Sequence, residues 1–326
     1  MPNRVMVVRD SHLNGGLKPD LRNATLQRAT IPDFSDLWRQ IGAASFVGND
    51  GRTYPFQKPA PCPGSGLQTN QNSKELSVNG IRLPLTPIRI EGVPETTIPA
   101  GETQFWRLAN TASDTVLDLE IFQGGNVVPM QVVSRDGVPL VQKNGHPTWQ
   151  AVPMSHVIIA PAGRVEFYLT GTAPGSRFII RTMKFDAGCL GDAEYTRDLI
   201  VVHVKPAKRL TPVRVPPSMD PVPARFSDLG FARPVAQRTF AFTEYPRKDS
   251  LEPDFYITQM SDPNAVETPF TMDEPPAVVV KNGTVEDWTI LNYTQEIHAF
   301  HIHQIHFLVL DSAGIAYGQG QLLDTI

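Results

Sequence analysis

The sequence predicts an all-β protein with more than one sandwich domain. Thirty prolines and 24 glycines among 326 residues indicate many short connections between strands. Short apolar runs recur between residues 76 and 204, separated by turn signals such as Asp136-Gly137 and Pro174-Gly175. A chain of this length usually folds into more than one domain, each with its own hydrophobic core. Antiparallel sandwiches or barrels therefore follow.

Each expected strand is an apolar run bounded by turn residues. The chain opens with such a run, Arg4–Asp10, and a helix candidate at Asp33–Ile41 precedes a Gly- and Pro-rich loop. The regular runs after this loop are Thr115–Phe122, Met130–Ser134, His156–Ile159, Val165–Thr170, Arg177–Thr182 and Leu199–Val204. Six prolines then fall between Lys205 and Pro223, and this density predicts a stiff linker between two domains.

Composition excludes several classes of partner. The net charge is −4, and the 29 Lys and Arg residues are scattered, so we expect no nucleic acid partner. No apolar run approaches the ~18 residues of a membrane span. The first residues lack an apolar signal region, but this would indicate the cytoplasm only if the numbering did not begin inside a longer protein. Cys62 and Cys189 permit one disulfide or two free thiols, and neither lies beside a histidine.

An internal repeat relates the two halves of the chain. The repeated residues are Gly101, Trp106 and Asn110 in the first copy and Gly283, Trp288 and Asn292 in the second. Glycine to tryptophan spans five residues, and tryptophan to asparagine four, in both copies. The repeat predicts two related β domains.

The two copies differ in their histidines. None follows Asn110 closely, whereas four of the eight histidines lie within a span of nine residues in the stretch after Asn292, at 298, 301, 303 and 306. On a strand, His301 and His303 face the same side with Cα atoms ~6.6–6.8 Å apart, and His298 faces the other. The alternative is ordinary polar residues on a half-buried strand. Because apolar neighbours would leave the imidazoles poorly hydrated, we favour a metal, although imidazole suits Zn, Cu, Fe and Ni alike.

The stretch His298-Ala-Phe-His-Ile-His-Gln-Ile-His-Phe-Leu-Val-Leu resembles the third-domain copper motif of multicopper oxidases, the laccase-like family built from cupredoxin domains. Segments 280–288 and 322–325 resemble that domain too. Segments similar to the copper-free middle domain of bacterial members are 77–80, 105–110, 135–139 and 160–167. The resemblance covers about Leu76 to Ile326.

This resemblance implies tandem cupredoxin-like Greek-key β-sandwich domains, the last one truncated. Residues 1–75 are expected to hold the end of a first cupredoxin domain plus a linker or loop. Residues 76–205 form a second, copper-free domain, residues 206–235 a Pro-rich linker, and residues 236–326 most of a third, copper-binding domain.

The resemblance also assigns roles to the histidines. His298 matches a ligand of the mononuclear type 1 copper, which accepts electrons from substrate. His301 matches a type 2 ligand and His303 a type 3 ligand of the trinuclear cluster that reduces dioxygen. His306 departs from the family pattern and is expected to be a neighbour rather than a ligand. Glu296 could tune the site or relay protons, but a solvent-facing carboxylate is the favoured alternative.

The implied function is one-electron oxidation of a phenolic, aromatic-amine or metal-ion donor, coupled to reduction of dioxygen to water. Its partners are dioxygen and a small reducing substrate, and its location is the periplasm or outside the cell. The sequence leaves the oligomeric state open. One alternative is a metal-free cupredoxin-fold structural or binding protein. Another is a zinc hydrolase, for which the sequence has no His-Glu-X-X-His motif.

Further ligands that the family needs have no match in the sequence. They are a His-Cys-His segment after the third-domain motif and two His-X-His segments in a first domain. The other histidines, at 12, 146, 156 and 203, are isolated from one another. We therefore expect a fragment that holds three of the copper ligands and is catalytically inert by itself.

Overall fold

The computed structural model describes residues 2–12, 45–47, 53–55, 74–84, 92–143, 146–188, 191, 193–207, 226, 229–245, 254–262, 268–294, 296–310 and 322–326. The predicted helix at 33–41, both cysteines and most of the Pro-rich linker lie outside these residues. The regular structure of the described part is β-strand except for one short 3-10 turn at Leu229–Phe231, so the predicted all-β class is confirmed. No helix in it is long and apolar enough to cross a membrane.

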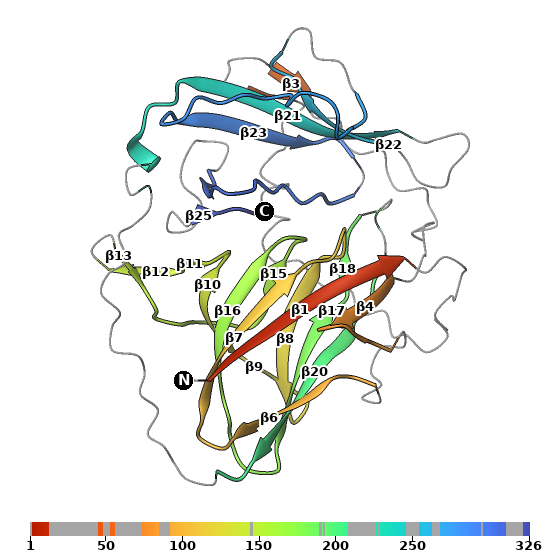
Figure 1. Cartoon of the computed structure of the whole chain (residues 1–326), viewed down its shortest axis with the longest axis vertical. Helices are drawn as coiled ribbons and strands as arrows, with labels where there is room; N and C mark the ends of the chain where they lie inside the picture. Colours follow the sequence, from red (N-terminus) through yellow and green to blue (C-terminus); the bar gives the residue numbers. More distant parts are fainter. Residues whose placement is uncertain are drawn as a thin grey trace.

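The first half of the chain folds into a two-sheet sandwich (Figure 1). One sheet has the order β11-β10-β16-β7-β1-β4-β5, with β14 on β10. Its strands are β1 (Asn3–His12), β4 (Lys74–Val78), β5 (Ile81–Arg82), β7 (Thr103–Asn110), β10 (Met130–Arg135), β11 (Val138–Pro139), β14 (Val152–Met154) and β16 (Arg164–Thr170). The other sheet has the order β15-β8-β17-β20-β6, with β9 on β8. Its strands are β6 (Glu95–Pro99), β8 (Leu117–Gln123), β9 (Asn126–Val128), β15 (Val157–Ile159), β17 (Arg177–Met183) and β20 (Arg197–Lys205).

Three short ribbons also occur in residues 1–205, and the one that contains β3 lies at the top of Figure 1, away from the sandwich. They are β2 (Ser45–Val47) with β3 (Thr53–Pro55), β12 (Val141–Lys143) with β13 (His146–Thr148), and β18 (Phe185–Asp186) with β19 (Ala193–Glu194). The six apolar runs predicted between residues 115 and 204 coincide with β8, β10, β15, β16, β17 and β20 within a few residues. Their positions are confirmed because each is a short run rich in apolar residues between turn signals, as expected of strands that face a core.

A single hydrophobic core lies between the two sheets. Buried and half-buried residues alternate along β7, β16 and β17, which is the period of a strand with one face toward a core. Trp106 and Phe167 are stacked in this core with ring centroids 6.2 Å apart, and each is at most 2% exposed. The core also takes in Met6 and Val8 of β1.

The position of β1 differs from the expectation that residues 1–75 end a preceding domain. β1 lies inside the sandwich sheet, where it pairs parallel with β7 and antiparallel with β4. Met6 and Val8 are 1% and 0% exposed, and their burial between these neighbours stabilises this placement. The segment Asn3–His12 is therefore a strand of the same sandwich as residues 76–205.

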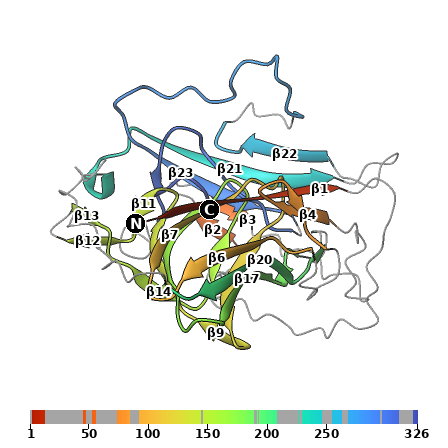
Figure 2. The ribbon, with the colours of Figure 1, turned by 60° about the horizontal axis from the view of Figure 1, so that its bottom comes forward.

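The second half forms a smaller sheet, β22-β21-β23, above the sandwich in Figure 1 and on one side of it in Figure 2. Its strands are β21 (Ala236–Tyr245), β22 (Asp254–Gln259) and β23 (Glu286–Asn292). A ribbon of β24 (Phe307–Leu308) and β25 (Leu322–Leu323) lies between this sheet and the sandwich, together with the end of the chain (Figure 1). The hydrophobic cluster described in the second half is small: Ala241 and Leu291 are buried together, and Tyr293 packs against them.

The internal repeat is confirmed by strand pairing. β1 runs parallel to β7 with Val8 opposite Asn110, and β21 runs parallel to β23 with Phe242 opposite Asn292. Each first strand also carries an antiparallel partner, β4 on β1 and β22 on β21. The repeated unit thus includes the opening strand of each half.

The repeated asparagines make the same hydrogen bonds. The Asn110 Oδ1 atom accepts from the Ala112 amide, and its Nδ2 atom donates to the Thr115 carbonyl at 2.8 Å. The Asn292 Oδ1 atom accepts from the Thr294 amide, and its Nδ2 atom donates to the Glu296 carbonyl at 2.7 Å. An asparagine that binds the backbone on both sides of a turn fixes the path of the chain after the strand. In the second half this path leads directly to His298.

A buried carboxylate holds the corresponding turn in the sandwich. Asp10 is 6% exposed and accepts hydrogen bonds from the Ser113 amide at 2.8 Å and from the Thr115 hydroxyl at 2.9 Å. Burial alone raises the pKa of Asp10, but the hydrogen bonds from residues 113–115 outweigh burial and lower this pKa to about 2.

Replacing Asp10 with Asn is expected to reduce the free energy of unfolding by about 2 kcal/mol at pH 7. The lowered pKa of Asp10 means that its stabilising effect is complete above the unfolded pKa near ~4 and is lost as the pH falls toward 2. Urea unfolding at several pH values measures this, with the exposed Asp273→Asn as the control. Equal pH dependence in the wild type and Asp10→Asn would contradict the prediction.

Candidate metal centre

The histidine segment is not the regular strand that its alternation predicted. Residues 297–306 are extended but irregular, and only His301 forms a β-bridge, with Thr325. The Phe300 amide donates to the Ile326 carbonyl at 2.9 Å, and the Ile302 amide donates to the Asp324 carbonyl at 3.1 Å. The segment turns at residues 303–304, where Gln304 has a φ of 71°. Short pairing with residues 324–326 therefore replaces a continuous strand.

His298 lies in an aromatic environment. Its ring stacks on Phe242 of β21 with centroids 5.0 Å apart, and Phe255 of β22 meets it edge-on at 5.9 Å. Burial lowers the pKa of the His298 imidazole, so the ring is neutral at pH 7. A neutral imidazole keeps one lone pair for a metal.

A hydroxyl group selects which nitrogen of His298 holds the proton. The Thr294 Oγ1 atom lies 2.8 Å from His298 Nε2, and its own proton is directed at the Asn292 side chain, at 2.7 Å, or at the Glu296 carbonyl. Oγ1 therefore accepts from Nε2–H, since a hydroxyl has only one proton to donate. The Nδ1 atom of His298 is left with the lone pair.

His301 and His303 lie side by side, as their spacing predicted. Their ring centroids are 4.8 Å apart at 66°. The Nδ1 atom of His301 is 2.8 Å from the Asp324 carbonyl oxygen and 2.9 Å from Thr325 Oγ1. The Thr325 hydroxyl donates to Asp324 Oδ1 at 2.9 Å, so both neighbours of Nδ1 act as acceptors. His301 therefore carries its proton on Nδ1, and its Nε2 lone pair remains available.

His306 and Glu296 occupy positions that the sequence left open. The Nε2 atom of His306 donates to the carbonyl of Asp136 at 3.0 Å, so His306 contacts the sandwich. Glu296 is half-buried rather than facing solvent, and its carboxylate is 3.8 Å from His298 Nε2. Its backbone forms a β-bridge with Gly188, and the Ile297 amide donates to the Ala187 carbonyl at 2.8 Å. The sandwich thus contacts the histidine segment at both ends.

An ion pair across the two halves lies beside His301. Arg164, at the start of β16, donates to the two carboxylate oxygens of Asp324 at 2.6 and 2.5 Å. Burial raises the pKa of Asp324, but the hydrogen bonds from Arg164 and Thr325 outweigh burial and lower it. Arg164 also donates to the backbone carbonyls of Ala162 and Asp136, at 2.8 and 3.0 Å. The guanidinium group is therefore fixed by the sandwich before it meets Asp324.

The donor chemistry of the segment fits copper, but the number of donors that converge is small. Imidazole is a ligand that copper accepts. Within the residues that the structure describes, no three His, Cys, Asp or Glu side chains converge closely enough to hold a metal ion. His301 and His303 supply two imidazoles at one place, and His298 supplies one at another.

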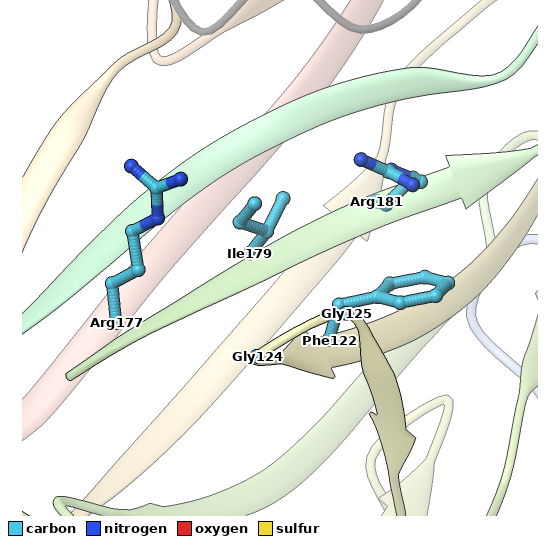
Figure 3. A pocket seen from close by; sticks show the side chains of 6 residues that line it. All are labelled: Phe122, Gly124, Gly125, Arg177, Ile179 and Arg181. Atoms are coloured by element: carbon cyan, nitrogen blue, oxygen red, sulfur yellow. The ribbon is translucent and has the colours of Figure 1, made fainter.

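The other described features offer no competing centre. His156 is paired with Asp118 at 2.9 Å, and His203 with Glu95 at 3.1 Å, both on the sandwich. A shallow pocket lies on the outer face of β8 and β17, and no histidine lines it (Figure 3). It is lined by Phe122, Gly124, Gly125, Arg177, Ile179 and Arg181. The Arg181 guanidinium covers the Phe122 ring and is paired with Asp198, so its charge is already compensated.

Sequence reasoning missed the residues that orient the histidines. Thr294 follows the repeated Asn292 by two residues, and this local spacing could have indicated a polar contact with the histidine segment. Arg164 and Asp324 are 160 positions apart, and no local pattern connects them.

Comparison with known proteins agrees with the family resemblance. A family model of multicopper oxidases matches residues 246–321, the half that carries the histidines. Comparison with curated proteins gives no match. A laccase-like multicopper oxidase, CueO, of Ochrobactrum sp. is 21% identical, with a TM-score of 0.55, over 99% of this chain and 57% of its own. A variant of the McoA multicopper oxidase of Aquifex aeolicus is 15% identical, with a TM-score of 0.55, over 99% of this chain and 56% of its own.

A multicopper oxidase of Pseudomonas thermotolerans is 15% identical, with a TM-score of 0.52, over 100% of this chain and 58% of its own. At such low sequence identities these similarities show the fold alone. This chain spans a little over half of the length of these three proteins. The resemblance to multicopper oxidases and the cupredoxin-like fold are thus confirmed.

Replacing Thr294 with Val, which keeps the shape but removes the hydroxyl, is expected to lower the free energy of unfolding by about 1–3 kcal/mol. Thr294 is 4% exposed, and loss of its hydroxyl removes the acceptor of His298 Nε2–H and one of the two donors to Asn292 Oδ1. Urea unfolding measures the change. The matched control is Thr284→Val, whose hydroxyl is exposed and donates to the Lys281 carbonyl. Similar losses in both variants would show that Thr294 has no special part in holding His298.

Proposed function

We propose that the chain contributes three ligands to the copper centres of a multicopper oxidase. His298 is assigned to the mononuclear type 1 copper, and His301 and His303 to the type 2 and type 3 positions of a trinuclear cluster. The observation that carries the proposal is the division of the histidines into two environments. His298 lies between Phe242 and Phe255, whereas the His301 and His303 rings adjoin each other.

The state of the imidazoles supports ligation. In both His298 and His301 a hydrogen bond holds the proton on one ring nitrogen and leaves the other with its lone pair. Metal-bound histidines in proteins usually have such a partner on the second nitrogen. His303 is exposed, and its ring lies next to that of His301, so a second imidazole is available at the same place. Further ligands must come from outside the described residues.

When bound, copper would supply one-electron oxidation of a phenolic, aromatic-amine or metal-ion donor and reduction of dioxygen to water. The chain's own residues bind and orient: Thr294 and Asp324 fix the imidazoles, and Phe242 excludes water from one face of His298. We propose the periplasm or the cell exterior as the location, as in the family. A small reducing substrate and dioxygen are the proposed partners. The purified 326-residue chain is proposed to lack oxidase activity by itself.

The runner-up is a metal-free cupredoxin-fold structural or binding protein. Copper binding separates the two. Titration of the purified chain with Cu²⁺, followed by electron paramagnetic resonance, should show imidazole coordination that a His301→Ala/His303→Ala double variant weakens by more than about tenfold. The control double variant is His156→Gln/His203→Gln, whose histidines are paired with carboxylates. If both double variants bind Cu²⁺ as the wild type does, the copper assignment is wrong.

Expression of the complete gene that carries this sequence tests the separate roles. A copper–thiolate absorption band is expected in the visible spectrum. His298→Ala should abolish this band, whereas His303→Ala should retain it and stop oxygen consumption with a phenolic donor. A colourless product that takes up no copper would favour the metal-free alternative.

A further inference from the structure

The contact between the two halves includes a chain of hydrogen bonds that ends on a proposed copper ligand. It begins at the Arg164 guanidinium, passes through the Asp324 carboxylate, and continues from the Asp324 carbonyl to His301 Nδ1. Asp324 is 8% exposed and Thr325 is 3% exposed, so this path is shielded from water. Hydrogen bonds to ionised groups in such surroundings are stronger and more directional than exposed ones.

The sandwich fixes Arg164 in advance. Its side chain donates to the carbonyls of Ala162 and Asp136, and its own amide donates to Asp136 Oδ1 at 2.9 Å. Asp136 begins the tight turn between β10 and β11, with φ values of 51° at Asp136 and 79° at Gly137. The hydrogen bonds within the sandwich therefore fix the Arg164 guanidinium, which forms two parallel hydrogen bonds with the Asp324 carboxylate.

Asp324 in turn fixes the backbone that faces His301. Its carboxylate is held by Arg164 and accepts from the Thr325 hydroxyl, while its carbonyl accepts from His301 Nδ1 and from the Ile302 amide. The His301 segment has no regular strand of its own, so this contact decides where the ring lies. His306 adds a second contact to the same turn, through the Asp136 carbonyl.

We propose that Arg164, a residue of the half without the histidine cluster, is a positioning residue for His301. Through Asp324 it keeps the proton of His301 on Nδ1 and directs the Nε2 lone pair toward the metal. Only the last step, in which the Nε2 lone pair is directed toward a metal, rests on the proposed function of His301. The placement of the proton is a property of the metal-free chain.

The tautomer can be read directly from the chain without metal. In protein labelled with 15N-histidine, long-range 15N–1H spectra distinguish a ring protonated on Nδ1 from one protonated on Nε2, and a His301→Gln sample assigns the signals. The wild type should show His301 as the Nδ1–H tautomer. Arg164→Gln should give a mixture of tautomers, and Arg164→Lys an intermediate result because an ammonium group cannot form the fork.

The matched control is Arg107→Gln. Arg107 on β7 pairs with Glu166 on β16 within the sandwich, at 3.0 Å, and does not contact Asp324. If Arg164→Gln does not fold, Arg164→Lys, which keeps the charge but not the fork, takes its place; Thr325→Val removes one acceptor of His301 Nδ1 and one donor to the Asp324 carboxylate but keeps Arg164. A retained single Nδ1–H tautomer in both Arg164→Gln and Thr325→Val would overturn the inference.

Cu²⁺ titration of the same variants tests the last step. Arg164→Gln should bind Cu²⁺ at the His301/His303 position about tenfold more weakly than the wild type, with Arg107→Gln unchanged. A tautomer mixture in Arg164→Gln together with unchanged Cu²⁺ affinity would overturn the metal role of His301 and leave its positioning by Arg164 supported. The two failures are therefore distinguishable.

Discussion

The ion pair between Arg164 and Asp324 is the interaction on which the histidine segment most depends. That segment makes few backbone bonds of its own, and its short pairing with residues 324–326 gives it shape. Residues 324–326 are in turn held against the sandwich by the bidentate pair. Because the Asp324 carboxylate is largely removed from water, loss of Arg164 would leave its charge uncompensated. The position of His301 therefore depends on a residue from the other half of the chain.

This dependence has a counterpart in the packing. The sandwich has a continuous core between two sheets, whereas the buried apolar residues in the described part of the second half are only Phe240, Ala241, Phe242 and Leu291. Burial of apolar surface is the main source of stability, so the second half gains much less from its own described core. Hydrogen bonds to Ala187, Asp136 and Arg164 of the sandwich add to the stability of the second half.

The features predicted from sequence are those with local causes. The repeat of Gly101 and Asn110 in Gly283 and Asn292 was visible because each residue acts within a few positions: the glycines have φ values of 75° and 77°, and the asparagines bind the next turn. The placement of β1 was not predicted, since its parallel pairing with β7 joins residues about 100 positions apart. The strand expected at His298–His303 was wrong for a related reason. Alternation shows which residues share a side, but the continuity of a strand requires a partner along its length.

The two related halves therefore differ in what their shared framework does. In the sandwich, the turn after Asn110 is closed by the Asp10 carboxylate, which accepts from residues 113–115. In the second half, the turn after Asn292 is closed by the Thr294 hydroxyl, which accepts from His298 instead. A carboxylate that gathers backbone donors stabilises its own turn, whereas a hydroxyl with one remaining lone pair can orient a neighbouring ring. The same asparagine thus supports a closed structural turn in one half and presents a histidine in the other.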